Sequence, residues 1–209
     1  MTGAQLGREA LIEASTALFA ERGVDGVSLG DIHRASGHRN RSATAYHFGG
    51  KEELVKELIT MVVEDHDGRR LDALERLLAG TDRPDLRSVL EATLTPLMED
   101  LTDGPLRLRL RMMANVIADE RYMGFTQAFM QTLPGLGLST SLIIGHLEPV
   151  PAELHVERIV LATSFGLRTI ADQARLIDSA HPNREPLDLA TFRAQLPLLL
   201  EALLLAPAP

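Results

Sequence analysis

Apolar side chains recur every three to four positions along most of this chain, which is the spacing of one face of an α-helix. Leu11, Ala14 and Leu18 form such a row near the start of the chain. Aromatic residues make up only 4% of the sequence, and runs of alternating β-branched residues are absent. The pattern therefore predicts an all-α protein, with helices over residues 8–22, 28–36, 41–48, 51–79, 84–101, 106–118, 120–133, 138–147, 151–178 and 188–205.

Two short predicted helices near the N-terminus are separated by a glycine-containing turn. Ser28 and Asp31 are three residues apart, a carboxylate variant of the capping box that favours a helix start at Ser28. Gly37 is expected to end this helix, because glycine adopts the left-handed backbone of a C′ position at little cost. Gly49 and Gly50 are expected to end the second helix. Two helices joined in this way can form a helix-turn-helix, whose second helix enters the DNA major groove.

The charge distribution supports a nucleic-acid partner for this helix pair. The chain has a net charge of −8, but residues 32–51 contain no Asp or Glu. Residues 1–51 carry six Lys/Arg and five Asp/Glu, whereas the rest of the chain carries fifteen and twenty-four. Positive charge concentrated on one small unit of an acidic protein is typical of phosphate binding.

The second short helix carries side chains suited to reading DNA. Arginine pairs bidentately with guanine and asparagine with adenine, which makes Arg39, Asn40 and Arg41 the best candidates for sequence readout. Contacts to base edges or adjacent phosphates are predicted for Arg39, Asn40, Arg41, Ser42 and Thr44. Contacts that position the helix on phosphates are predicted for Ser28, Tyr46, His47 and Lys51. Phe48 is expected to point into the core.

The N-terminal quarter of the chain resembles the TetR family of transcriptional repressors. The resemblance rests on FAERGVDGVSLGDI (19–32), ASG (35–37) and YHFGGKEEL (46–54). It implies a three-helix helix-turn-helix DNA-binding domain over residues 1–50 and a larger helical ligand-binding and dimerisation domain over residues 51–209. It also implies a homodimer that binds a palindromic double-stranded DNA operator and is released by a small effector.

The last two predicted helices are unusually apolar. Each carries a stripe wider than one core contact needs, and an exposed patch of that size would be a liability in a monomer. In TetR-like proteins these helices pair with their symmetry mates as a four-helix bundle. The predicted interface residues are Ile159, Thr163, Leu167, Ile170, Ala174, Phe192, Leu196, Leu199 and Leu203. A purely intramolecular bundle is the alternative.

Methionine and aromatic side chains gather in the central predicted helices. Methionine adapts its shape and suits permissive pockets, although such a cluster also fits an ordinary core. The resemblance favours an effector pocket here, and the apolar lining favours a mostly apolar small molecule. The candidate lining residues are Met98, Met112, Met113, Tyr122, Phe125, Phe129 and Met130, with Asn115, His146 and Arg168 as polar contacts.

Catalysis finds no support in the sequence motifs. Neither Asp65-His66-Asp67 nor His155 with its neighbouring glutamates has the spacing of a metal site, and no GxSxG nucleophile motif occurs. We therefore expect no enzyme activity, no metal and no cofactor. A DNA-binding regulator or adaptor that responds to no small molecule is the alternative function.

Location is inferred by elimination. The N-terminus lacks the apolar core of a signal peptide, and no apolar run approaches the roughly 18 residues that a membrane-spanning helix needs. The absence of cysteine excludes a disulfide framework. These features predict a cytoplasmic protein without a membrane partner.

Overall fold

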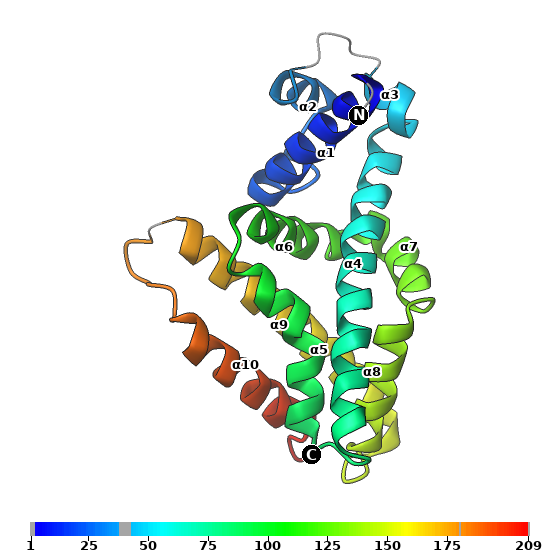
Figure 1. Ribbon diagram of the computed structural model, residues 1–209, viewed down its shortest axis with the longest axis vertical. Coiled ribbons are helices and arrows are strands. Elements are labelled where there is room, and N and C mark those ends of the chain that lie inside the picture. Colours follow the sequence, from blue (N-terminus) through cyan, green and yellow to red (C-terminus); the bar gives the residue numbers. More distant parts are fainter. Residues whose placement is uncertain (1–2, 38–42, 180, 209) are drawn as a thin grey trace. The chain divides into compact units, whose positions relative to one another are not determined.

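The computed structural model describes residues 3–37, 43–179 and 181–208. Within these residues the chain is helical and forms no β-strand, which confirms the all-α prediction (Figure 1). None of the helices in this part of the chain is long and apolar enough to cross a membrane. The elements are α1 (Gly3–Arg22), α2 (Leu29–Ala35), α3 (Ala43–Phe48), α4 (Lys51–Gly80), α5 (Leu86–Asp100), α6 (Gly104–Ile117), α7 (Glu120–Met130), α8 (Pro134–Gly145), the 3₁₀ helix η1 (Ala152–Leu154), α9 (His155–Asp178) and α10 (Leu189–Leu204).

The chain folds into two compact units whose boundaries differ from the predicted domains. Unit 1 comprises residues 1–63 and 108–129, and unit 2 comprises residues 64–107 and 130–209. The start of α4, most of α6 and nearly all of α7 therefore pack with the N-terminal helices rather than with the rest of the chain. The predicted functional division at residue 50 remains a prediction, but it does not coincide with a packing boundary.

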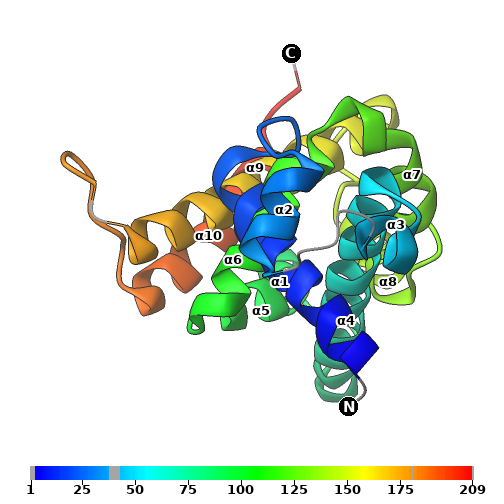
Figure 2. The same ribbon diagram turned by 90° about the horizontal axis from the view of Figure 1, so that it is seen from above.

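The core of unit 1 joins the three N-terminal helices to the start of α4. Phe19 of α1, Ile32 of α2 and Leu54 of α4 are fully buried. Full burial of such a side chain contributes roughly 1.5–3 kcal/mol. The helix α2 lies against α1 and α3, as the view from above in Figure 2 also shows for α1 and α2.

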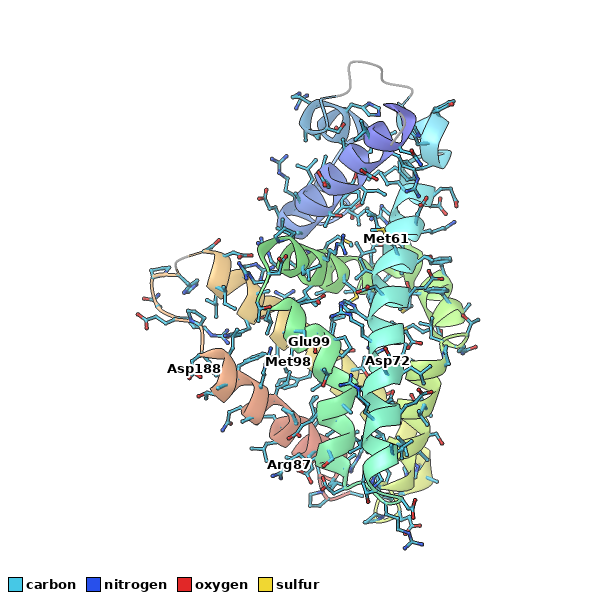
Figure 3. All side chains as sticks on the ribbon, in the orientation of Figure 1. Met61, Asp72, Arg87, Met98, Glu99 and Asp188 are labelled. Atoms are coloured by element: carbon cyan, nitrogen blue, oxygen red, sulfur yellow. The ribbon has the colours of Figure 1, made fainter. Side chains whose placement is uncertain are left out.

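Unit 2 is organised around α5. This helix packs against α8 and α10, and α10 in turn packs against α9. Figure 3 labels Met98 and Glu99 on α5 and Asp188 at the start of α10. Pro96 lies inside α5 and Pro197 inside α10, as the sequence predicts. A proline inside a helix removes one backbone hydrogen bond, and neighbouring packing must compensate for that loss.

Three helices start several residues away from the positions expected. α1 begins at Gly3 rather than residue 8, and α8 begins at Pro134 rather than residue 138. Proline suits the first turn of a helix, whose N–H groups lack helical partners anyway, so Pro134 starts α8 instead of breaking the pattern. α9 begins at His155 after the single turn of η1, instead of at Pro151.

Candidate nucleic-acid interface

The start of α2 is fixed by the predicted capping box. The Ser28 hydroxyl accepts a hydrogen bond from Asp31 N at 3.2 Å, and Asp31 Oδ2 accepts one from Ser28 N at 3.0 Å. The Ser28 hydroxyl also donates to Asp31 Oδ2 at 2.6 Å. Hydrogen bonds from the Ser28 side chain and backbone lower the pKa of Asp31 to about 2. The single hydroxyl proton of Ser28 is thus already engaged, and its predicted donation to a phosphate would have to displace Asp31.

The end of α2 matches its prediction. Gly37 follows the helix with a φ of +72°, in the left-handed region that glycine adopts without strain. His33 is buried within α2, while Arg34 is exposed and pairs with Asp31 at 3.1 Å. Of the basic side chains on this helix, Arg34 is therefore the one at the surface.

The four predicted readers Arg39, Asn40, Arg41 and Ser42 lie outside the described residues. Thr44 lies in α3, where only its backbone is described. Their roles in base recognition accordingly stay predictions. In the sequence, this segment lies between the described end of α2 at Ala35 and the described start of α3 at Ala43.

The last three side chains of α3 differ in exposure: Tyr46 is exposed, His47 is half-buried and Phe48 is buried. Tyr46 is 80% exposed, and its ring meets the ring of His47 edge to face at 4.9 Å. This exposure leaves Tyr46 available for a phosphate contact, whereas His47 is half-buried. Phe48 is buried, as predicted, and the guanidinium of Arg8 lies 5.2 Å from its ring centroid. The alternation along one helical turn orients α3 with one face to the core and one to solvent.

Lys51 has surroundings that sequence reasoning did not foresee. Its Nζ donates to Val24 O at 2.7 Å and to Val27 O at 2.5 Å. Burial, and next the charge of Arg121, lower the pKa of Lys51 from its ordinary value. The amine predicted to contact phosphate is thus bound to the loop between α1 and α2.

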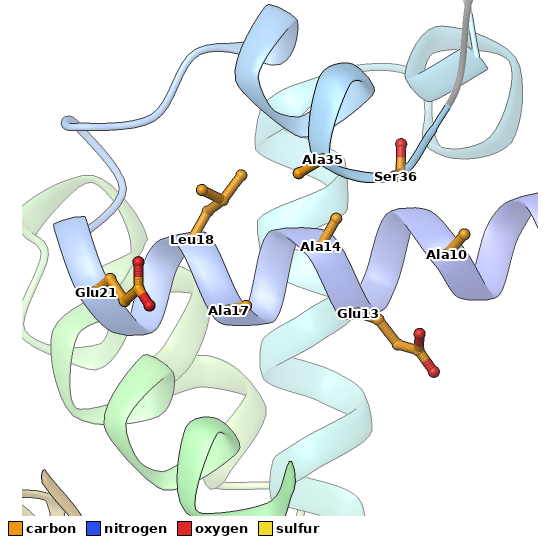
Figure 4. A pocket seen from close by; sticks show the side chains of 8 residues that line it. All are labelled: Ala10, Glu13, Ala14, Ala17, Leu18, Glu21, Ala35 and Ser36. Carbon is orange, nitrogen blue, oxygen red and sulfur yellow. The ribbon is translucent and has the colours of Figure 1, made fainter. Parts of the chain in front are cut away.

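A shallow groove of about 330 Å³ runs between α1 and α2 (Figure 4). The lining side chains are Ala10, Glu13, Ala14, Ala17, Leu18, Glu21, Ala35 and Ser36. The carboxylates of Glu13 and Glu21 in this lining would repel phosphate.

The predicted effector residues are distributed over both units. Unit 1 contains Met112, Met113, Asn115, Tyr122, Phe125 and Phe129, and unit 2 contains Met98, Met130, His146 and Arg168. Met112, Met113 and Tyr122 are buried, and the rings of Phe125 and Phe129 stack at 6.0 Å. Met98 lines a separate groove of about 480 Å³ between α5 and α10.

Two of the predicted polar contacts have structural partners instead. The Asn115 amide donates to Phe19 O at 3.0 Å and to Ala20 O at 3.3 Å, which satisfies carbonyls in the last turn of α1. Arg168 lies on an exposed part of α9 and pairs with Asp172 at 3.3 Å. Neither side chain is free to face a ligand without breaking these bonds.

A buried charged cluster in unit 2 was not predicted. His66 Nε2 lies 2.7 Å from Asp100 Oδ2, and Arg69 lies 2.9 Å from the other oxygen of the same carboxylate. The sequence neighbours Asp65 and Asp67 are not part of this His66 contact. Among the described residues, no group of three or more suitable side chains could hold a metal ion.

The apolar C-terminal helices divide the predicted dimer interface into two sets. Ile170, Ala174, Phe192 and Leu196 are buried within the chain and have no surface to offer a partner. Thr163 and Leu199 are exposed, and Ile159, Leu167 and Leu203 are half-buried. Further exposed apolar side chains of α9, outside this interface set, are Val156, Val160, Leu161 and Phe165.

Comparisons with known proteins agree with this geometry. Residues 11–58 match the family model described as bacterial regulatory proteins, tetR family. The match spans α1, α2, α3 and the start of α4, which are the elements that carry the capped helix and the exposed face of α3. A search of curated protein sequences found no significant match.

Solved structures show the same fold at low sequence identity. A protein from Shewanella sp. PV-4, described as a putative TetR-family transcription regulator, is 20% identical, with a TM-score of 0.62 over 95% of this chain and 96% of that one. The TetR-family regulator PfmR from Thermus thermophilus is 19% identical, with a TM-score of 0.55 over 93% of this chain and 96% of that one.

A third structure, from Mesorhizobium loti MAFF303099, is 18% identical, with a TM-score of 0.54 over 98% of both chains. It too is described as a putative TetR-family transcriptional regulator. Proteins of this family are DNA-binding regulators rather than enzymes. The family model identifies residues 11–58 as a TetR-type DNA-binding region, and the chain as a whole shares its all-α fold with these solved structures.

Proposed function

We propose that the protein is a repressor that binds a palindromic DNA operator as a homodimer and is released by a small, mostly apolar effector. The observation that carries the DNA-binding part is the capped α2 followed by α3, whose Tyr46 is exposed and whose Phe48 is buried. This is the arrangement that a helix needs in order to enter a groove while it stays anchored to its domain.

The homodimer is supported by apolar side chains that the single chain leaves in solvent. Val156 is 71% exposed, and Val160, Leu161 and Leu199 are each about half exposed. A helix-turn-helix protein also needs two half-sites, because one unit alone contacts few base pairs. A two-fold contact through α9 and α10 would cover these side chains and hold two reading helices together.

The effector is supported by the buried face of α7 in unit 1. Tyr122 and Thr126 are four residues apart on α7, and both are buried. They belong to the same unit as the buried Met112 and Met113 of α6. The Thr126 hydroxyl has no hydrogen-bond partner among the described residues. A buried polar group without a partner is unfavourable, so an apolar ligand with one hydrogen-bonding group at Thr126 would relieve this cost.

The first experiment selects bound DNA from a random pool with the purified protein. A palindromic consensus supports the proposal, whereas a single unpaired half-site contradicts it. With the operator in hand, small apolar compounds are screened for a raised melting temperature and a lowered operator affinity. Linkage requires that the operator weaken ligand binding by the same factor, typically about 1–3 kcal/mol of coupling.

Thr126→Val provides a matched control, because it keeps the shape of the side chain and removes the hydroxyl. We expect this substitution to stabilise the free protein by up to about 1 kcal/mol and to lower its affinity for the effector. A ligand that binds without changing operator affinity would favour the alternative, a DNA-binding regulator or adaptor with no small-molecule control.

A further inference from the structure

The loop between α1 and α2 is held by a side chain that follows it in sequence by more than twenty positions. Lys51 Nζ bridges the carbonyl oxygens of Val24 and Val27. Both valine side chains are themselves buried, so the loop is fixed from its apolar and its polar side. Val27 directly precedes Ser28, the N-cap of α2. The ammonium therefore fixes the backbone at the point where α2 starts.

A second side chain holds the same loop from α7. Arg121 lies 2.7 Å from Asp25 Oδ1 in the loop, and its Nε donates to Asp119 Oδ1 at 2.9 Å. Asn115 binds the last carbonyls of α1 just before the loop. All of these contacts lie within unit 1. The α6–α7 segment thus makes hydrogen bonds to the end of α1 and an ion pair with the loop that follows it.

The charges of this cluster act on one another. The charge of Arg121 lowers the pKa of Lys51, while Asp25 and Asp119 raise it, and burial has the largest effect. Two cations thus face two carboxylates, and the cluster is close to neutral. A neutral cluster adds little to the long-range attraction for DNA. Any effect of the cluster on DNA binding therefore comes from the position in which it holds the α1–α2 loop.

We propose that Lys51 and Arg121, together called the loop clamp, are positioning residues for DNA recognition that fix the α1–α2 loop without touching DNA. The clamp orients α2 through its N-cap, and α2 lies against α3. A reading helix must be held closely in its productive geometry, and supporting residues provide this. The clamp also gives α7 a direct connection to the loop.

Lys51→Met tests the Lys51 contact of the loop clamp, because it keeps an unbranched stem and removes the ammonium. Affinity for the selected operator is measured over a salt series. A positioning residue predicts at least a tenfold loss of affinity with an unchanged log–log salt slope. A phosphate contact made once in each protomer predicts that the slope falls by roughly 2. That fall in slope would overturn the proposal.

Lys51→Arg keeps the proposal testable if Lys51→Met folds poorly. The substitution retains a cation, so a phosphate contact would survive it. The clamp predicts that arginine does not rescue affinity, because its longer planar group cannot place one nitrogen between the two carbonyl oxygens. Full rescue by arginine contradicts the clamp.

Asp25→Asn tests the second half through the sign of its effect. Removing a negative charge from a DNA-binding unit should tighten binding if only overall electrostatics matter. The clamp predicts the opposite, a several-fold weaker operator complex, because Arg121 loses its loop partner. Glu21→Gln is the matched control, since Glu21 is exposed on the nearby helix α1 and has no ion-pair partner in the described part of the chain. It should leave affinity unchanged or slightly higher.

Arg121→Gln and the double variant complete a mutant cycle. The clamp predicts that the double variant binds no more weakly than either single variant, and that amide exchange at residues 24–28 speeds up in both. Additive losses, or an unchanged exchange rate in the loop, would show that Arg121 and Asp25 do not act together.

Discussion

The Asp67 carboxylate supplies an N-cap for a helix that lacks one of its own. Residue Leu133 at the N-cap position of α8 makes no side-chain cap, but Asp67 accepts from Gly135 N at 2.9 Å and from Leu136 N at 2.8 Å. Asp67 also pairs with the buried Arg70 at 3.0 Å. One carboxylate therefore satisfies free N–H groups of α8 and the charge of Arg70, and it joins α4 to α8.

Gly135 lets α8 come this close, which leads to a prediction for single substitutions. A Cβ at residue 135 would lie 2.6 Å from Asp67 O, an atom in the backbone of α4 that cannot easily move. We expect Gly135→Ala to destabilise the protein by roughly 1–3 kcal/mol in urea denaturation. Gly137→Ala in the same helix meets nothing within 4 Å and should stabilise by about 0.4–1 kcal/mol. Equal effects of the two substitutions would show that the close contact does not exist.

At the level of helices, α4 and α5 are joined through the carboxylate of Asp100. Burial raises the pKa of Asp100, but the hydrogen bonds and charges of His66 and Arg69 outweigh it and hold the pKa below 3.8. A carboxylate whose pKa is lowered in the folded state stabilises the protein at any pH above the pKa that the same group has in the unfolded chain. This stabilisation is lost as the pH falls from about 4 through the folded pKa.

The Asp100 link predicts a defined pH dependence. Asp100→Asn should lower stability at neutral pH and flatten the decline of the free energy of unfolding below about pH 4. Urea denaturation from pH 7 to pH 3 measures both effects. Asp82→Asn, in the exposed loop between α4 and α5, is the control and should leave the curve unchanged. If the free energy of unfolding declines below about pH 4 as steeply in Asp100→Asn as in the original protein, other carboxylates cause that decline.

The existence of the helices was predictable, whereas their partners were not. Apolar periodicity located each helix, and the Ser28–Asp31 pair and Gly37 marked real ends of α2, because these signals are local in the sequence. Lys51 and Asn115 were assigned to ligands because each is a polar residue in a suitable place. Their actual partners are carbonyls that no local pattern connects to them.

The C-terminal helices show that periodicity also fails to predict which helix surface is buried within the chain. Apolar side chains occur on more than one face of α9, and periodicity alone cannot tell which face meets the rest of the same chain. Ile170 is fully buried, whereas Phe165 is 43% exposed, although both are large apolar residues of this helix. The interface residues were therefore predicted only at the level of the helix.

For the whole molecule, the exposed face of α9 predicts the oligomeric state. Leu161→Glu combined with Phe165→Glu should give a monomer in sedimentation at micromolar concentration and leave the melting behaviour of the chain cooperative. Operator affinity should fall at least tenfold, because two half-sites reinforce each other only when the protomers are linked.

Met123→Glu is the control for this interface, since Met123 is even more exposed than Leu161 and Phe165 but lies on α7. It should leave both sedimentation and operator affinity unchanged. A dimer that persists with both glutamates on α9 would move the interface elsewhere on the chain.

The discontinuous make-up of unit 1 limits how this regulator can be recombined with others. Residues 108–129 supply Asn115 and Arg121 to the end of α1 and its loop, although the chain leaves the unit at Val63 and returns to it at Leu108. The N-terminal helices therefore do not contain all of the residues that pack together in unit 1. A chimera that transplants them onto a foreign core without residues 108–129 would lose the contacts of Asn115 and Arg121 with the end of α1 and its loop.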